Sequence, residues 1–149
     1  MHSHQTSLFT FNEVQVTYHT KELGPRIENS REAFEFLSDR WPNVDYCERM
    51  YVLMVNRNNH ILGVAFISEG SVGGTVADPK KIFQIALKAN ASGILVAHNH
   101  PSGNLRPSQN DIKLTKKLKE AGLLLDLPLM DHIIITSKSY TSLSDEGLI

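Results

Sequence analysis

Two histidines and one aspartate, in the segment HNHPSGNLRPSQND at 98–111, have the types and spacing of metal ligands. His98 and His100 flank Asn99, and because side chains alternate across a strand, the two imidazoles are expected to project to the same side. Asp111 follows after a loop containing proline and glycine, which gives the chain a compact way to fold back. The segment therefore predicts one ion held by His98, His100 and Asp111.

This ligand set has a specific chemical meaning. Two imidazole nitrogens and one carboxylate oxygen are typical of catalytic zinc sites, which bind at about 2.0–2.2 Å and leave a fourth position for water. Zinc lowers the pKa of bound water toward about 7 and polarises a carbonyl, so one ion supplies both a nucleophile and a Lewis acid. The pattern favours hydrolysis with zinc as the cofactor.

A hydrolytic zinc site also needs a general base to take the proton of the water. Glu48 and Glu69 are the candidates, and Glu48 is preferred because it lies where a predicted strand starts, a rigid position for aiming a carboxylate. Taken singly, each would be interpreted as a solvated surface carboxylate. His132, at the head of an apolar run, is assigned either a structural role or a supporting role beside the ligands, with no choice between the two.

The elements that must position these residues follow from hydrophobic periodicity. Asp111 lies in the first turn of the third predicted helix, and Ser108 is the expected N-cap of that helix. A polar cluster at 56–60 predicts a hairpin, and GSVGGTV at 70–76 predicts a plain turn or bulge rather than a phosphate loop. The interleaved order predicts an α/β fold with one mixed sheet and flanking helices. The expected strands cover 8–18, 50–55, 61–67, 94–97, 130–136 and 140–143, and the expected helices run from Asn29 or Ser30 to Trp41, from Asp78 and Pro79 to Asn90, and from Ser108 to Ala121.

Length and composition set the outer limits. A chain of 149 residues with 41% hydrophobic and 21% charged residues fits one globular domain. Its apolar runs are far shorter than the roughly 20 residues of a membrane span, and the N-terminus lacks the pattern of a signal peptide. The expected protein is soluble and cytoplasmic. Cys47 is the only cysteine, which excludes zinc sites built on cysteine pairs, and it is predicted to be packed in the interior rather than to act as a nucleophile.

Charge gives little information about partners. The formal net charge of −1 provides no general attraction to nucleic acid, although nucleic acid is not excluded as a partner. One predicted helix carries four lysines, which are interpreted as a solvated face: Lys113, Lys116, Lys117 and Lys119. The partner expected from the site is a peptide or protein substrate, and assembly into a homo-oligomer stays open.

The segment HNHPSGNLRPSQND resembles the metal-binding motif of the RadC family, a branch of the JAMM/MPN+ (JAB domain) metalloprotease-like proteins. The resemblance extends through SEGSVGGTVADPKKIFQIALKANASGILVAHNHPSG, LMDHIII and the terminal DEGLI, so that residues 28–149 form the RadC-like domain and 1–27 an N-terminal strand extension. It implies a fold akin to cytidine deaminases, zinc on the two histidines and the aspartate, Glu48 as the base, and Ser108 as a stabiliser of the oxyanion. Longer RadC proteins carry a helix-hairpin-helix region that this sequence is expected to lack.

Several functions compete at this stage. The favoured one is zinc-dependent hydrolysis of an amide bond, of the peptidase or isopeptidase kind. The alternative is a DNA-repair-associated enzyme or accessory protein of the RadC type, and a third is a noncatalytic domain that keeps zinc for stability. A nucleobase deaminase is set aside, because its H-x-E and P-C-x-x-C ligands need two cysteines.

Overall fold

The structure is a computed structural model that describes residues 22–70 and 77–149. The strand predicted at 8–18 lies outside the described residues, as does nearly all of the turn predicted at 70–76.

Helices and strands interleave along the described chain, as the periodicity predicts. The expected antiparallel hairpin at 56–60 is confirmed, because the strands on either side of it pair directly. The helices are α1 (Ser30–Ser38), α2 (Pro79–Lys88) and α3 (Gln109–Leu124), and the strands are β1 (Arg49–Val55), β2 (Ile61–Glu69), β3 (Gly93–Asn99), β4 (Leu129–Ile135) and β5 (Tyr140–Ser142).

The five strands of the described chain form one mixed sheet in the order β2-β1-β3-β4-β5. Only β3 and β4 run parallel, and α3 makes the crossover between them, as a parallel connection requires. The other neighbouring pairs are antiparallel. The predicted mixed α/β fold is confirmed.

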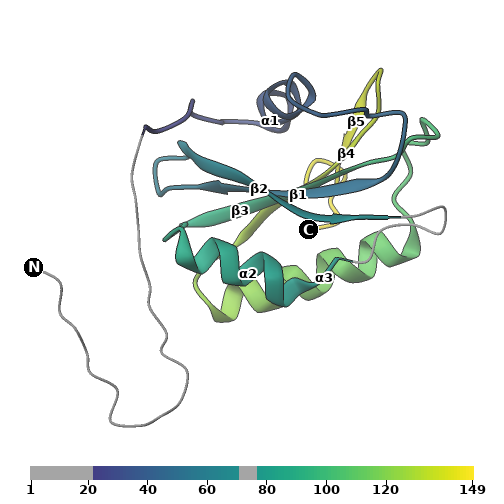
Figure 1. Cartoon of the computed structure of the whole chain (residues 1–149). Helices are drawn as coiled ribbons and strands as arrows, with labels where there is room; N and C mark the ends of the chain where they lie inside the picture. Colours follow the sequence, from purple (N-terminus) through teal and green to yellow (C-terminus); the bar gives the residue numbers. More distant parts are fainter. Residues whose placement is uncertain (1–21, 71–76) are drawn as a thin grey trace, which may run out of the picture.

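Helices cover both faces of the sheet, with α1 on one side and α2 and α3 on the other (Figure 1). Two apolar clusters fill the spaces between these layers, one around Ile82, Val96 and Leu118, the other around Leu53 and Ile133. Every residue of β3 is buried, which is why its sequence is a continuous apolar run up to the histidines. Burying one such side chain contributes about 1.5–3 kcal/mol, so β3 is a rigid support for whatever follows it.

The predicted helix starts are confirmed, but some of the predicted ends are displaced. Asn29, Asp78 and Ser108 are the N-caps, each accepting a hydrogen bond from a backbone N–H of its own first turn. Helix α1 ends three residues before Trp41, and α3 continues past Ala121 to Leu124. The leucines in this last part of α3, Leu123 and Leu124, are exposed. A pattern of buried apolar positions therefore could not predict that the helix continues through them.

Within the described ranges, no helix combines the length and the apolar composition needed to cross a membrane.

Candidate metal centre

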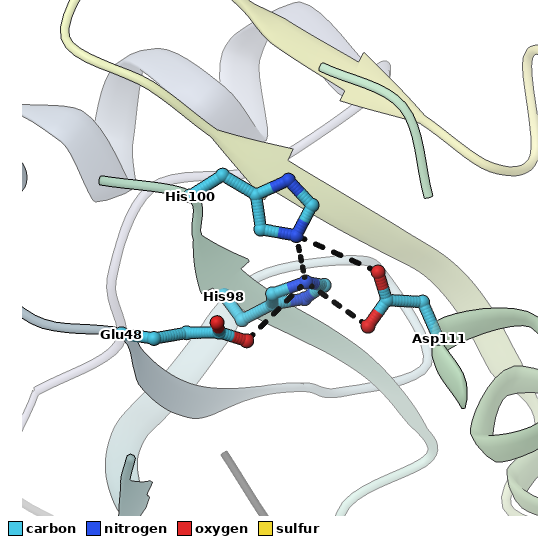
Figure 2. A group of neighbouring side chains, drawn as sticks. All are labelled: Glu48, His98, His100 and Asp111. Atoms are coloured by element: carbon cyan, nitrogen blue, oxygen red, sulfur yellow. Dashed lines mark hydrogen bonds and ion pairs between the residues drawn. The ribbon is translucent and has the colours of Figure 1, made fainter. Parts of the chain in front are cut away.

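Four side chains from separate parts of the fold converge on one point (Figure 2). His98 is the penultimate residue of β3 and His100 lies one residue beyond its end. Asp111 is in the first turn of α3, and Glu48 directly precedes β1, which pairs with β3. One ligand atom from each of the four lies within 4.8 Å of the others. The structure thus brings together the three predicted ligands and the preferred base.

The spacing of these atoms can be compared with a zinc site. The Nε2 atoms of His98 and His100 lie 2.9 Å apart, and the Asp111 oxygens lie 3.3 Å from Nε2 of His98 and 3.5 Å from Nε2 of His100. Ligands about 2.0–2.1 Å from a tetrahedral ion are about 3.4 Å apart. Each pair is within about half an ångström of that separation, so the donor set fits zinc with a small opening of the two imidazoles.

The outer nitrogen of His100 is held by the loop that follows it. Nδ1 of His100 donates to the backbone carbonyl of Asn104 at 2.6 Å, since a carbonyl oxygen can only accept. In the neutral ring, Nε2 then carries the lone pair and faces the other ligands. In the protonated ring Nε2 carries a proton that it can donate to Asp111, which raises the pKa of His100, and burial opposes this rise.

Asp111 belongs both to the helix and to the site. Its carboxylate accepts from the backbone N–H of Ser108 at 2.8 Å while the Ser108 hydroxyl accepts from the N–H of Asp111 at 3.0 Å, which makes a capping box. Burial disfavours its charge, but the close contacts with His100 and His98 and the hydrogen bond from Ser108 outweigh that cost and hold the pKa of Asp111 far below the usual range. A fixed carboxylate anion therefore faces the two imidazoles.

His132 takes part in the same network from behind His98. Its Nε2 lies 2.7 Å from Nδ1 of His98, and its Nδ1 lies 2.6 Å from the hydroxyl of Thr115. Burial of this fully enclosed side chain lowers the pKa of His132 to about 3, so the ring is neutral. His132 therefore contacts a predicted ligand, which is one of the two roles left open for it, and no sequence pattern pointed to Thr115.

Asn99, which points away from the histidines, fixes the segment that carries Glu48. Its amide accepts from the backbone N–H of Arg49 at 2.7 Å and donates to the carbonyls of Val44 and Cys47 at 2.7 and 2.9 Å. Oε1 of Glu48 lies 3.9 Å from Nε2 of His98. Sequence reasoning missed this role, although a fully buried asparagine next to a buried strand is a signal for such a network.

Glu69, the other candidate base, lies outside the cluster of four. It forms an ion pair with Arg49 at 2.8 Å and accepts a hydrogen bond from the thiol of Cys47 at 3.1 Å. Cys47 is half-buried and not enclosed, so the prediction that it is packed in the interior is only partly correct. Its hydrogen bond to Glu69 raises the pKa of Cys47, which disfavours the thiolate and agrees with the prediction that it is not a nucleophile.

The fold and the cluster together define a class: a mixed α/β domain with a candidate metal centre where a buried strand ends and a helix begins. Residues 27–148 match the RadC-like JAB domain family. The chain therefore belongs to that family, as the resemblance of the histidine segment indicates.

Curated relatives carry names without a stated activity. The chain is similar to a UPF0758 protein of Flavobacterium johnsoniae, 39% identical over 83% of this chain and 53% of the relative. It is also similar to UPF0758 protein STH371 of Symbiobacterium thermophilum, 33% identical over 81% and 51%, and to UPF0758 protein SAB1521c of Staphylococcus aureus, 37% identical over 85% and 58%. The chain spans about half the length of the curated relatives it matches.

Proposed function

We propose that this domain is a zinc-dependent hydrolase of the JAMM type that cleaves an amide bond in a peptide or protein. The observation that carries the proposal is the convergence of His98, His100, Asp111 and Glu48 within 4.8 Å. Three of these side chains match the ligand set of catalytic zinc, and the fourth adds a carboxylate beside it. Membership of the JAB domain family supports the same reaction class.

The roles of the residues follow from their chemistry. His98, His100 and Asp111 would hold the ion, which when bound supplies an activated water and a Lewis acid for the substrate carbonyl. Glu48 takes a proton from the attacking water as the new carbon–oxygen bond forms. It then returns that proton to the amide nitrogen, which leaves as an amine when the carbon–nitrogen bond breaks.

Ser108 is proposed to stabilise the oxygen on which negative charge develops. Its hydroxyl accepts a hydrogen bond from the backbone N–H of Asp111, and its own proton can be donated toward a substrate. The N-terminus of α3 adds a partial positive charge at the same place.

Metal content and turnover, measured on the same samples, test this proposal. Wild type should retain zinc after dialysis and cleave members of a peptide or isopeptide library. We expect His100→Ala to lose zinc and Glu48→Gln to keep it while turnover falls by about 10²–10⁴-fold. The control is Glu69→Gln, which removes a nearby carboxylate that is already paired with Arg49 and should change neither quantity.

Two outcomes would contradict the assignment. If Glu69→Gln abolished turnover and Glu48→Gln did not, the base would be Glu69. If zinc-loaded protein cut single-stranded DNA in a parallel assay but no amide, the DNA-repair alternative would replace the proposed hydrolase. Zinc without turnover of either kind would indicate a domain stabilised by its metal.

A further inference from the structure

The two histidines of the candidate metal centre differ in what holds their outer nitrogen. Nδ1 of His100 meets a backbone carbonyl, which can only accept, so its proton position is fixed. Nδ1 of His98 meets Nε2 of His132, and an imidazole nitrogen can either donate or accept. Which nitrogen of His98 carries the proton therefore depends on the contacts of His132.

The hydroxyl of Thr115 decides the direction of that hydrogen bond. Its Oγ1 lies 2.7 Å from the backbone oxygen of Asp111 and 2.6 Å from Nδ1 of His132. Because the carbonyl has no proton, the hydroxyl must donate its single proton to Asp111 and accept from His132. The opposite direction would leave two oxygen atoms 2.7 Å apart with no proton between them.

The remaining steps follow from one proton per neutral ring. His132 is fully buried, and both of its ring nitrogens are used by these two contacts. With its proton on Nδ1, it offers a lone pair at Nε2, and His98 must donate Nδ1–H to it. The lone pair of His98 then lies on Nε2, beside the Asp111 carboxylate and Nε2 of His100.

We propose that Thr115 and His132 are positioning residues that keep the proton of His98 on Nδ1 and its Nε2 ready to bind zinc. This inference rests on the proposed function for its purpose, but the tautomer itself can be measured without metal. The chain of hydrogen bonds starts at the backbone oxygen of one proposed ligand, Asp111, and ends at the ring of another, His98. Two residues of α3, Asp111 and Thr115, therefore determine the proton position of His98. Partners that hold the outer nitrogen of a metal-binding histidine contribute about 10–100-fold to metal affinity.

Nitrogen-15 NMR of histidine-labelled, chelator-treated full chain tests the tautomer at a mildly alkaline pH where imidazoles are neutral. We expect wild-type His98 to be the Nδ1–H tautomer. Thr115→Val preserves shape and removes the hydroxyl, so we expect the proton of His98 to shift toward Nε2. Thr115→Ser should restore the wild-type tautomer. The control is Thr136→Val, which removes another buried hydroxyl that donates to a carbonyl, here that of Ser139, without contacting a histidine.

Zinc affinity, measured by competition with a chromophoric chelator, provides the second readout. We expect Thr115→Val to weaken zinc binding by about 10–100-fold, with Thr115→Ser close to wild type. Wild-type His98 found as the Nε2–H tautomer, or an unchanged tautomer in Thr115→Val, would overturn the inference. If no variant binds zinc but the tautomers behave as expected, the proposed function fails and the proton-directing contacts stand.

Discussion

At the scale of single residues, Asp111 combines two tasks that most helix-capping residues do not share. One oxygen accepts from the backbone of Ser108, and both oxygens face imidazole nitrogens. Capping alone would leave the carboxylate exposed to solvent, but here it is largely enclosed beside His98 and His100. The tasks can be separated experimentally, because an amide can replace a carboxylate in a cap but is a poor zinc ligand.

We predict that Asp111→Asn loses zinc but keeps the hydrogen bond of the capping box, because the asparagine oxygen can still accept from the backbone N–H of Ser108. Asp111→Ala should also lose zinc and be about 1 kcal/mol less stable than Asp111→Asn in the metal-free state, since the hydrogen bond from the backbone N–H of Ser108 is lost while the Ser108 hydroxyl keeps its own. Zinc content after dialysis and urea unfolding of chelator-treated samples measure the two effects. Equal stabilities for the asparagine and alanine variants would show that the hydrogen bond from Ser108 to the side chain at position 111 contributes nothing.

The sequence predicted the residues that point into the site better than those that support them. His98, His100 and Asp111 could be found because residue type and spacing along a strand and a helix start are local properties. Asn99 and Thr115 could not, since the partners of Asn99 lie 50 or more residues away, and the contact of Thr115 with His132 depends on how α3 packs against β4. Their importance comes from tertiary contacts, which no local pattern encodes.

At the scale of elements, α3 begins at the site and ends in a close backbone contact. A Cβ on Gly122 would lie 2.4 Å from the carbonyl oxygen of Leu127, whose own N–H donates to the carbonyl of Gly122 at 2.8 Å. The chain turns back on the helix here through Asp126, which has a positive φ of 51°. This contact sets where β4 starts and therefore where His132 lies along it.

We predict that Gly122→Ala destabilises the protein by about 1–3 kcal/mol, because the overlap with backbone outweighs the roughly 1 kcal/mol that alanine gains in a helix. The control is Gly63→Ala in β2, where the nearest atom is the Met54 methyl at 3.7 Å, and its stability should match or slightly exceed wild type. Urea unfolding measures both. A Gly122→Ala protein that resists urea better than wild type would show that the helix end can move aside.

At the scale of the whole molecule, the class of fold was predictable but the strand order was not. Alternating periodicities indicated one mixed sheet with helices packed on it. The insertion of β1 between β2 and β3 depends on which edges meet, and it is this pairing that brings Glu48 beside His98. Zinc would connect the start of β1, the end of β3 and the start of α3, so binding should stabilise the whole fold.

The charge states of two histidines give that stability a defined dependence on pH. His100 has a raised pKa in the fold, so its contribution is complete below its unfolded value of about 6.5 and is lost as the pH rises through the folded value. His132 has its pKa lowered to about 3, so its contribution is present above about 6.5 and is lost as the pH falls toward 3. With regard to these two groups, chelator-treated protein is most stable near pH 6.5.

Zinc should reverse the alkaline part of this profile. Protons compete with zinc for His100, so the stabilisation by zinc grows as the pH rises from about 6.5 to 8, whereas the metal-free protein loses stability there by at most about 1.4 kcal/mol per pH unit. Thermal unfolding with saturating zinc and with chelator, at each pH, measures both slopes. In Asp111→Asn, we expect the alkaline slope of the metal-free protein to flatten and zinc to have no effect, because His100 has lost the partner that raises its pKa. A zinc effect that is independent of pH, or that survives in Asp111→Asn, would place the ion on other ligands.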